Sequence, residues 1–105
     1  MLQISTETTS QTVLTTFEVT PGTCQDLLDA LTDAYRDVIS KQPGFIAASL
    51  HVNDAQTRIA NYSQWEDRKD FQAMLRTDEM RKRNRAINEL CKSFEPVMYE
   101  VSATF

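Results

Sequence analysis

The stretch RIANYSQWED, residues 58–67, places an amide, a hydroxyl and an indole where they could act on one ligand. Its alternation predicts a β-strand, in which every second side chain points to the same face, so Asn61, Ser63 and Trp65 share a face. Amide and indole side chains carry N–H donors, and two donors in an apolar cavity suit a carbonyl or phenolate oxygen that gains negative charge during a reaction. The structural alternative is that Trp65 belongs to the core and Asn61 braces a neighbouring strand.

Two further polar residues could serve such a site. His51, the sole histidine, could deprotonate a substrate at neutral pH, although a lone strand histidine is more often structural or exposed. Asn84 lies at the edge of an apolar helical stripe and could face a pocket, with capping or solvation as the alternative. Because Gly22 and Gly44 are the only glycines, and His, Cys and carboxylates show no metal-binding spacing, we expect neither a phosphate loop nor a metal site.

The composition limits the class of protein. The chain has 105 residues, 41% of them hydrophobic and 25% charged, which is typical of one globular domain. Eleven basic against fifteen acidic residues give a net charge of −4, which disfavours nucleic acid and anionic membranes as partners. No apolar run approaches the ~20 residues that span a bilayer, and the start, MLQISTETTSQT, does not resemble a signal peptide. We expect a cytoplasmic protein with a flexible polar arm over residues 1–11, a domain over 12–105, and free thiols at Cys24 and Cys91.

Periodicity predicts the elements that position these side chains. Period-two patterns indicate strands, apolar residues at helical spacing indicate helices, and Pro-Gly pairs mark turns. The pattern predicts strands over residues 13–19, 45–52, 57–65 and 97–105. It predicts one helix with Thr23 as a candidate N-cap that ends before Pro43-Gly44, and a second over 66–94 with a break at Thr77-Asp78. This order is the α+β, ferredoxin-like β-α-β-β-α-β arrangement, a four-stranded antiparallel sheet with the helices on one face.

The strand over residues 45–52 is apolar on both sides. Strict alternation groups Phe45 with Ala47 on one side, and the opposite side also carries apolar residues. Helices can cover only one face of the sheet, so we expect a second copy of the chain to cover the other and form a homodimer. Tyr35 and Tyr62 are expected in the core or the dimer interface.

A chain of this length and order, with QPGFIAASLHV leading into NYSQWED, resembles the antibiotic biosynthesis monooxygenase family of dimeric α/β-barrel proteins over residues 12–105. It is most similar to the branch that forms quinones from aromatic polyketides, of the actinorhodin and tetracenomycin type. The sharpest shared element is N-x-x-x-W, here Asn61 and Trp65, which the resemblance implies contact the substrate. It also implies oxygenation of a phenol or anthrone by O₂ as co-substrate, without metal, haem or flavin, in a site that orients the substrate, stabilises its anion and excludes water.

Two positions complicate the resemblance. The branch commonly has a tyrosine early in the helix after the tryptophan-containing strand, where this chain has Phe71 and so lacks a proton donor. An arginine later in that region is also implicated, and Arg81, Arg83 and Arg85 compete for the role. The family position lies nearest Arg85, whereas helical phase directs Arg85 away from the apolar stripe. The expected catalytic set is Asn61, Trp65, Arg85 and His51, and the expected substrate-binding residues are Ser63, Phe71, Met74, Leu75 and Asn84.

Two other functions compete with this one. A haem-degrading member of the same superfamily would hold iron through a helix histidine, and the only histidine here lies in a predicted strand. A dimeric module that binds small aromatic ligands, or regulates, without catalysis is the other alternative, and Phe71 in place of a tyrosine favours it. Oxygen uptake distinguishes a binding module from an enzyme.

Overall fold

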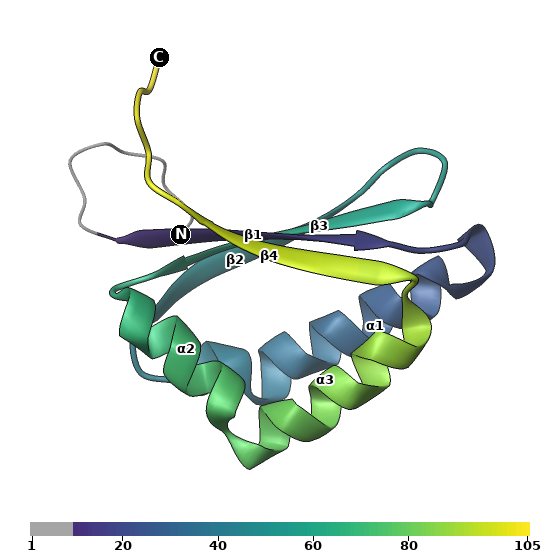
Figure 1. Cartoon of the computed structure of the whole chain (residues 1–105), viewed down its shortest axis with the longest axis horizontal. Coiled ribbons are helices and arrows are strands. Elements are labelled where there is room, and N and C mark those ends of the chain that lie inside the picture. Colours follow the sequence, from purple (N-terminus) through teal and green to yellow (C-terminus); the bar gives the residue numbers. More distant parts are fainter. Residues whose placement is uncertain (1–9) are drawn as a thin grey trace.

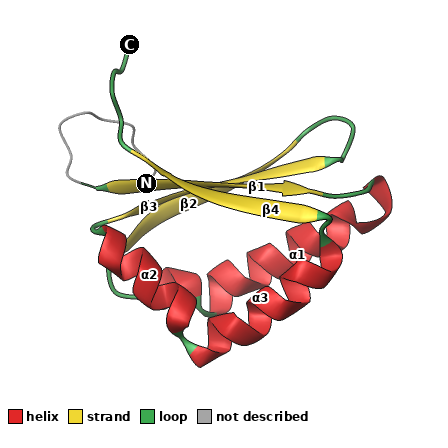
Figure 2. Ribbon diagram, in the orientation of Figure 1, coloured by secondary structure: helices red, strands yellow, loops and turns green. Residues whose placement is uncertain are grey.

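Within residues 10–105, four antiparallel strands form one sheet, and the helices pack against the same face of it (Figures 1 and 2). The computed structural model describes residues 10–105. The expected arm, residues 1–11, therefore lies outside the described residues except for Ser10 and Gln11, and Gln11 is the first residue of a strand. The elements are β1 (Gln11–Glu18), α1 (Pro21–Asp37), the short 3₁₀ helix η1 (Ile39–Lys41), β2 (Phe45–Val52), β3 (Arg58–Trp65), α2 (Arg68–Arg76), α3 (Asp78–Leu90) and β4 (Ser93–Tyr99). The predicted ferredoxin-like order is confirmed.

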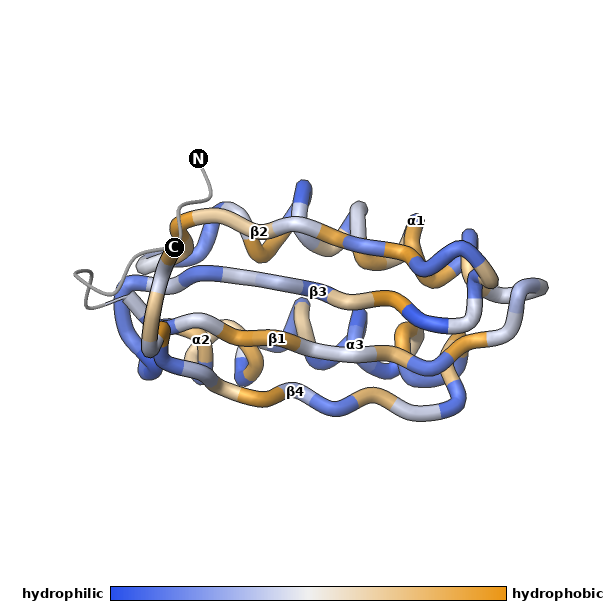
Figure 3. Tube along the Cα trace, turned by 90° about the horizontal axis from the view of Figure 1, so that it is seen from above, coloured by the Kyte–Doolittle hydropathy of each residue, from blue (hydrophilic) through white to orange (hydrophobic). Residues whose placement is uncertain are grey.

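The sheet order is β2-β3-β1-β4, so the strand with the candidate residues is central (Figure 3). In the register of β1 and β3, Thr15 pairs with Asn61 and Val13 pairs with Ser63. Paired residues of an antiparallel sheet point to the same face. The face that carries Asn61 and Ser63 is therefore also the face on which the buried Val13 lies, and it is the one that the helices cover.

Local signals explain where the second helical region divides. Asp67 caps α2 by accepting from the backbone N–H of Lys69 at 3.1 Å. Thr77, in an extended conformation, ends α2 and caps α3, because its Oγ1 accepts from the N–H of Met80 at 3.3 Å. The predicted break at Thr77-Asp78 is confirmed, and it bends the helical layer so that both segments reach the sheet (Figure 1).

The end of α3 differs from the expectation that the helix reaches residue 94. It ends at Leu90 because Cys91 is extended, with φ −123° and ψ 157°, and the N–H of Lys92 donates to the carbonyl of Glu18 at 2.7 Å. β4 then begins at Ser93 and includes Pro96, which an edge strand tolerates because a strand needs no N–H on its outer side. Residues 100–105, expected in the strand, lie beyond it and extend away from the helices (Figure 1).

The start of β2 also differs from strict alternation. A register shift between Phe45 and Ala47 turns Phe45 to the helix-covered face, where its ring packs on Tyr35 and Trp65. A bulge of this kind re-aims a side chain without ending the strand. Expecting Phe45 to share a face with Ala47 was therefore wrong, and the change places an aromatic ring beside Trp65.

Gly44 allows the beginning of α2 to approach β2. Its φ of +83° lies in the left-handed region, and a Cβ at this position would collide with the side chain of Asp70. The carbonyl of Gly44 accepts from the N–H of Glu66 at 2.7 Å, which fixes the end of β3 against the same turn. The Pro43-Gly44 turn thus sets the position of Trp65 as well as that of Phe71.

Two other expectations concern the whole chain. Cys24 and Cys91 are free thiols, as predicted, and burial raises the pKa of the Cys91 thiol. Within residues 10–105, none of the helices combines the length and the apolar character that a membrane crossing requires.

Candidate functional site

A cavity of about 300 Å³ lies between the sheet and the helical layer. Its lining includes most of the expected site: Asn61, Ser63 and Trp65 from β3, Phe71, Met74 and Leu75 from α2, and Asn84 from α3. It is completed by Thr15, Phe17, Leu31, Tyr35, Ile39, Met80, Ile87, Asn88, Phe94 and Pro96. No residue in this lining, taken over residues 10–105, carries a formal charge, so the cavity suits a neutral or weakly acidic ligand.

The indole of Trp65 is buried, and its N–H is bonded within the protein. Its Nε1 donates to Ser63 Oγ at 3.2 Å, and Ser63 Oγ in turn lies 3.5 Å from the carbonyl of Val13, to which it donates. Trp65 is 0% exposed. The expectation that the indole offers a second donor to a ligand therefore needs correction. The N–H of Trp65 is already hydrogen-bonded to Ser63, so Trp65 contributes only the apolar surface of its ring to the cavity.

Asn61 has the opposite arrangement. Its Oδ1 accepts a hydrogen bond from the hydroxyl of Tyr35 at 2.6 Å. Its Nδ2 has no hydrogen-bond partner among residues 10–105. Every buried side-chain nitrogen or oxygen in that range has a partner, so Nδ2 is not buried, and Asn61 lines the cavity. An amide nitrogen carries two hydrogens to donate. Asn61 is thus the polar side chain of β3 that has a donor left for a ligand.

Tyr35 was not among the expected site residues. It lies on α1, and burial raises the pKa of its hydroxyl, while hydrogen bonds with Asn61 and Ser63 partly oppose that rise. The phenol is therefore neutral and can donate over the physiological range. One signal in the sequence could have identified it: Tyr35 continues the apolar stripe of α1 that includes Leu27 and Leu31, and its side chain ends in a hydroxyl.

Four aromatic rings, one from each of four elements, form a cluster in which Phe45 and Phe71 contact Trp65 and Tyr35 contacts Phe45. The rings of Phe45 and Trp65 meet edge to face, with centroids 5.4 Å apart and planes at 82°. Trp65 and Phe71 meet at 5.9 Å and 67°, and Tyr35 and Phe45 at 6.0 Å. Edge-to-face pairs are favourable beyond the apolar area they bury. Tyr35, Trp65 and Phe71 of this cluster line the cavity and give it an aromatic wall, behind which Phe45 packs on Trp65.

His51 does not reach this cavity. It pairs with Ala60 on the face of the sheet opposite to Asn61, and its exposed ring shares a hydrogen bond of 2.8 Å between Nε2 and Ser49 Oγ. The expectation that it serves as the base of this site is not met, because alternation along β2 turns Leu50 toward the helices and His51 away from them.

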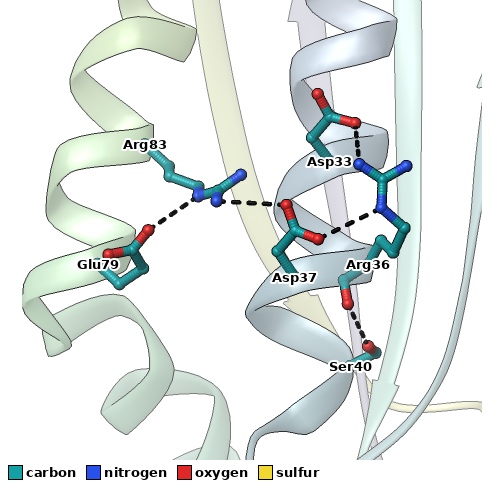
Figure 4. A network of polar contacts seen from close by, with 6 residues as sticks. All are labelled: Asp33, Arg36, Asp37, Ser40, Glu79 and Arg83. Carbon is teal, nitrogen blue, oxygen red and sulfur yellow. Dashed lines mark hydrogen bonds and ion pairs between the residues drawn. The ribbon is translucent and has the colours of Figure 1, made fainter.

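None of the three competing arginines lines the cavity. Arg81 and Arg85 are exposed on α3, which agrees with helical phase and corrects the expectation for Arg85. Arg83 instead bonds to Glu79 at 3.3 Å and to Asp37 of α1 at 3.4 Å (Figure 4). This ion-pair network ties α3 to α1 on the outer side of the helical layer.

A larger and more open hollow, of about 570 Å³, runs along the edge strand β2. Its lining is Thr32, Tyr35, Arg36, Ser40, Phe45, Ala47, Ala48, Ser49 and Leu50. The charge of Arg36 is paired with Asp33 at 2.6 Å and Asp37 at 3.3 Å (Figure 4). Because the amide of Asn61 and the rings of Trp65 and Phe71 line the smaller cavity and not this hollow, we assign the candidate site to the smaller cavity.

Comparison with known proteins gives consistent results. The family model described as antibiotic biosynthesis monooxygenase matches residues 10–86. Tetracenomycin-F1 monooxygenase of Streptomyces glaucescens is 35% identical over 63 residues, which cover 60% of this chain and only 56% of that relative.

Among solved structures, the ActVA-Orf6 monooxygenase of Streptomyces coelicolor, in complex with nanaomycin D, has a TM-score of 0.78 at 24% identity. The superposition covers 91% of this chain and 90% of that protein's chain. SnoaB of Streptomyces nogalater, a cofactor-independent oxygenase, has a TM-score of 0.73 at 20% identity, with coverages of 90% and 95%. At these identities the structures show the fold.

Proposed function

Because the chain belongs to the antibiotic biosynthesis monooxygenase family, we propose that it oxygenates a polycyclic aromatic phenol or anthrone with O₂, to a quinone, without a metal, haem or flavin. The observation that carries the proposal is the uncharged cavity with an aromatic wall and a free amide donor at Asn61. The tetracenomycin-F1 monooxygenase and the nanaomycin D complex support an aromatic polyketide as the ligand class.

In the proposed reaction, the substrate supplies the electrons. An anthrone that loses a proton to water becomes an electron-rich enolate, which transfers an electron to O₂. Recombination of the resulting radicals forms a C–O bond and gives a peroxide anion, which takes back a proton from water. The hydroperoxide so formed loses water to leave a carbonyl. The net change converts CH₂ and O₂ into C=O and H₂O, with the ring carbon oxidised and O₂ reduced.

The side chains of the cavity have three tasks in this reaction. The N–H of Asn61 stabilises the negative charge on the substrate oxygen, where a fixed donor in a water-poor site is more effective than in water. The rings of Trp65 and Phe71 hold the aromatic plane, and Met74 and Leu75 close the apolar wall. Because the cavity lining that residues 10–105 form is uncharged, no cationic side chain in it competes with Asn61 for the negatively charged substrate oxygen.

The size of the cavity limits the substrate. Small-molecule pockets span roughly 300–1,000 Å³, and this one, at about 300 Å³, lies at the lower end of that range. A compact, flat, fused-ring compound therefore fits better than a ring system that carries a sugar or a long side chain.

The proposal includes a homodimer. The face of the sheet away from the helices carries apolar side chains that the described chain leaves partly exposed, among them Leu14, Tyr62, Val97 and Tyr99, the last 48% exposed. Exposed apolar patches of this kind commonly mark protein interfaces. A second copy that covers this face would bury them.

Oxygen uptake tests the proposed activity. The purified protein is mixed with 1,8-dihydroxyanthrone or 1-naphthol, and O₂ is followed with an electrode while quinone is followed by absorbance. We expect anthrone and O₂ to be consumed in equal amounts, faster than with heat-denatured protein, which controls for autoxidation. If the compounds change the fluorescence of Trp65 but O₂ uptake equals the control, the protein is a binding module.

A further inference from the structure

We propose that Tyr35 is a positioning residue of this site, whose hydroxyl locks the amide of Asn61 with its N–H toward the ligand. An effect of Tyr35 on catalysis rests on the proposed function, whereas the orientation of the Asn61 amide rests only on the geometry of α1 and β3. Tyr35 and Asn61 are 26 residues apart in the chain and meet at 2.6 Å.

A side-chain amide has two orientations, related by a flip, that exchange its donor and its acceptor. At Asn61 one orientation presents N–H to the cavity and the other presents a carbonyl oxygen, which would repel an anionic substrate. The structure shows the first orientation, in which the phenol of Tyr35 donates to Oδ1 and the amide N–H is left for the cavity. In the flipped orientation the amide would donate to the phenol oxygen, and the O–H of Tyr35 would lose Oδ1 as its acceptor. The bond therefore selects the orientation of the amide that binds an oxyanion.

The surroundings keep Tyr35 in the donor role. Its pKa is raised by burial, so the hydroxyl keeps its hydrogen through neutral and mildly alkaline pH. Its ring packs on Phe45 at 6.0 Å, which fixes the direction in which the hydroxyl points. On the other side of the same helix, Asp37 is bonded to Arg83 of α3 at 3.4 Å, which steadies the end of α1 that carries Tyr35 (Figure 4).

The first test removes only the hydroxyl. Tyr35→Phe keeps the ring and its packing, and Tyr62→Phe is the matched control, since Tyr62 lies in β3 on the opposite face of the sheet. We expect Tyr35→Phe to lower kcat/KM for 1,8-dihydroxyanthrone by roughly three- to tenfold, the effect of one hydrogen bond, and Tyr62→Phe to change it by less than about twofold. Equal kcat/KM for the parent and Tyr35→Phe would overturn the proposal.

A double-mutant cycle separates positioning from general support of the fold. If Tyr35 acts through Asn61, then Tyr35→Phe in an Asn61→Ala background changes kcat/KM by less than about twofold, because nothing remains to be oriented. Fully additive losses in the double variant would contradict action through Asn61. Asn61→Asp adds a second distinction, because it preserves an acceptor for Tyr35 but replaces the N–H by an oxygen, so we expect it to lose activity like Asn61→Ala.

A binding measurement keeps this proposal distinct from the proposed function. 1,8-Dihydroxyanthraquinone, which is already oxidised, is titrated while the fluorescence of Trp65, the only tryptophan, is followed. We expect weaker binding in Tyr35→Phe than in the parent and no such weakening in the Asn61→Ala background. If the parent consumes no O₂ and this coupling is present, the activity is wrong and the role of Tyr35 stands. If the parent consumes O₂ and the coupling is absent from both binding and turnover, the role of Tyr35 is wrong.

Discussion

The indole N–H of Trp65 donates to the hydroxyl oxygen of Ser63 at 3.2 Å, two residues earlier on the same strand face. The bond satisfies the polar atom of a side chain that is otherwise surrounded by rings, and it explains how the tryptophan can be wholly buried at the edge of a cavity. Trp65 and Ser63 thus form a structural pair within the site, and Asn61 is left as the donor for a ligand.

Removal of the Ser63 hydroxyl tests this pair. Ser63→Ala leaves the N–H of Trp65 buried without an acceptor, which costs about 1–3 kcal/mol in the free energy of unfolding. Urea denaturation followed by circular dichroism measures the change. Ser102→Ala, at an exposed position beyond β4, is the control and should alter the free energy by about 0.5 kcal/mol or less. Equal stability of Ser63→Ala and the parent would show that the indole N–H does not depend on Ser63.

Alkaline pH tests the burial of Tyr35. Burial raises its folded-state pKa above the ordinary value of 10.0, so its contribution to stability is complete below pH about 10 and is lost as the pH rises through the folded-state pKa. The stability of the parent should therefore fall more steeply above pH about 10 than that of Tyr35→Phe, as measured by urea denaturation across this range. Cys91 is present in both proteins, so its titration cancels in the difference. Parallel curves would contradict the shift.

Replacement of His51 tests whether the outer face takes part in catalysis. Because His51 lies on the face of the sheet opposite to Asn61, His51→Ala should leave kcat with 1,8-dihydroxyanthrone within about twofold of the parent at every pH examined. Steady-state oxygen uptake across the neutral range measures it. A loss of one limb of the pH–rate profile in His51→Ala would instead identify this residue as a base that acts on the substrate.

A charge on the outer face tests the proposed homodimer. We expect a dimer by sedimentation velocity at micromolar concentration, and Val97→Glu should shift it toward monomer, because the charge would be buried between the two sheets. Ala73→Glu, which adds the same charge on the exposed surface of α2, is the control and should remain dimeric. A parent protein that is monomeric and well folded at this concentration would refute the dimer.

Much of the fold follows from local patterns that the sequence displays directly. Alternation placed Asn61, Ser63 and Trp65 on one face, because period two survives in a regular strand. The break at Thr77 was predictable, since a capping threonine acts within its own turn. Helical phase also directed Arg85 outward, in agreement with its exposed position.

The features that sequence reasoning missed depend on contacts between distant segments. The bond between Tyr35 and Asn61 joins α1 to β3, and only the packing of that helix on the sheet brings the two atoms together. The bulge that turns Phe45 inward arises from its register against β3 rather than from its neighbours in the chain. The early end of α3 at Leu90 depends likewise on the pairing of Lys92 with Glu18 of β1.

The turnover of Asn61→Ala tests the central claim most directly. Parent and variant, both verified as folded by circular dichroism and by cooperative urea denaturation, are compared in oxygen uptake with 1,8-dihydroxyanthrone at saturation. If the N–H of Asn61 stabilises the substrate anion, kcat falls by a factor on the order of 10²–10³, the loss found when a catalytic oxyanion donor is removed. A folded Asn61→Ala protein that turns over at the rate of the parent would contradict the account.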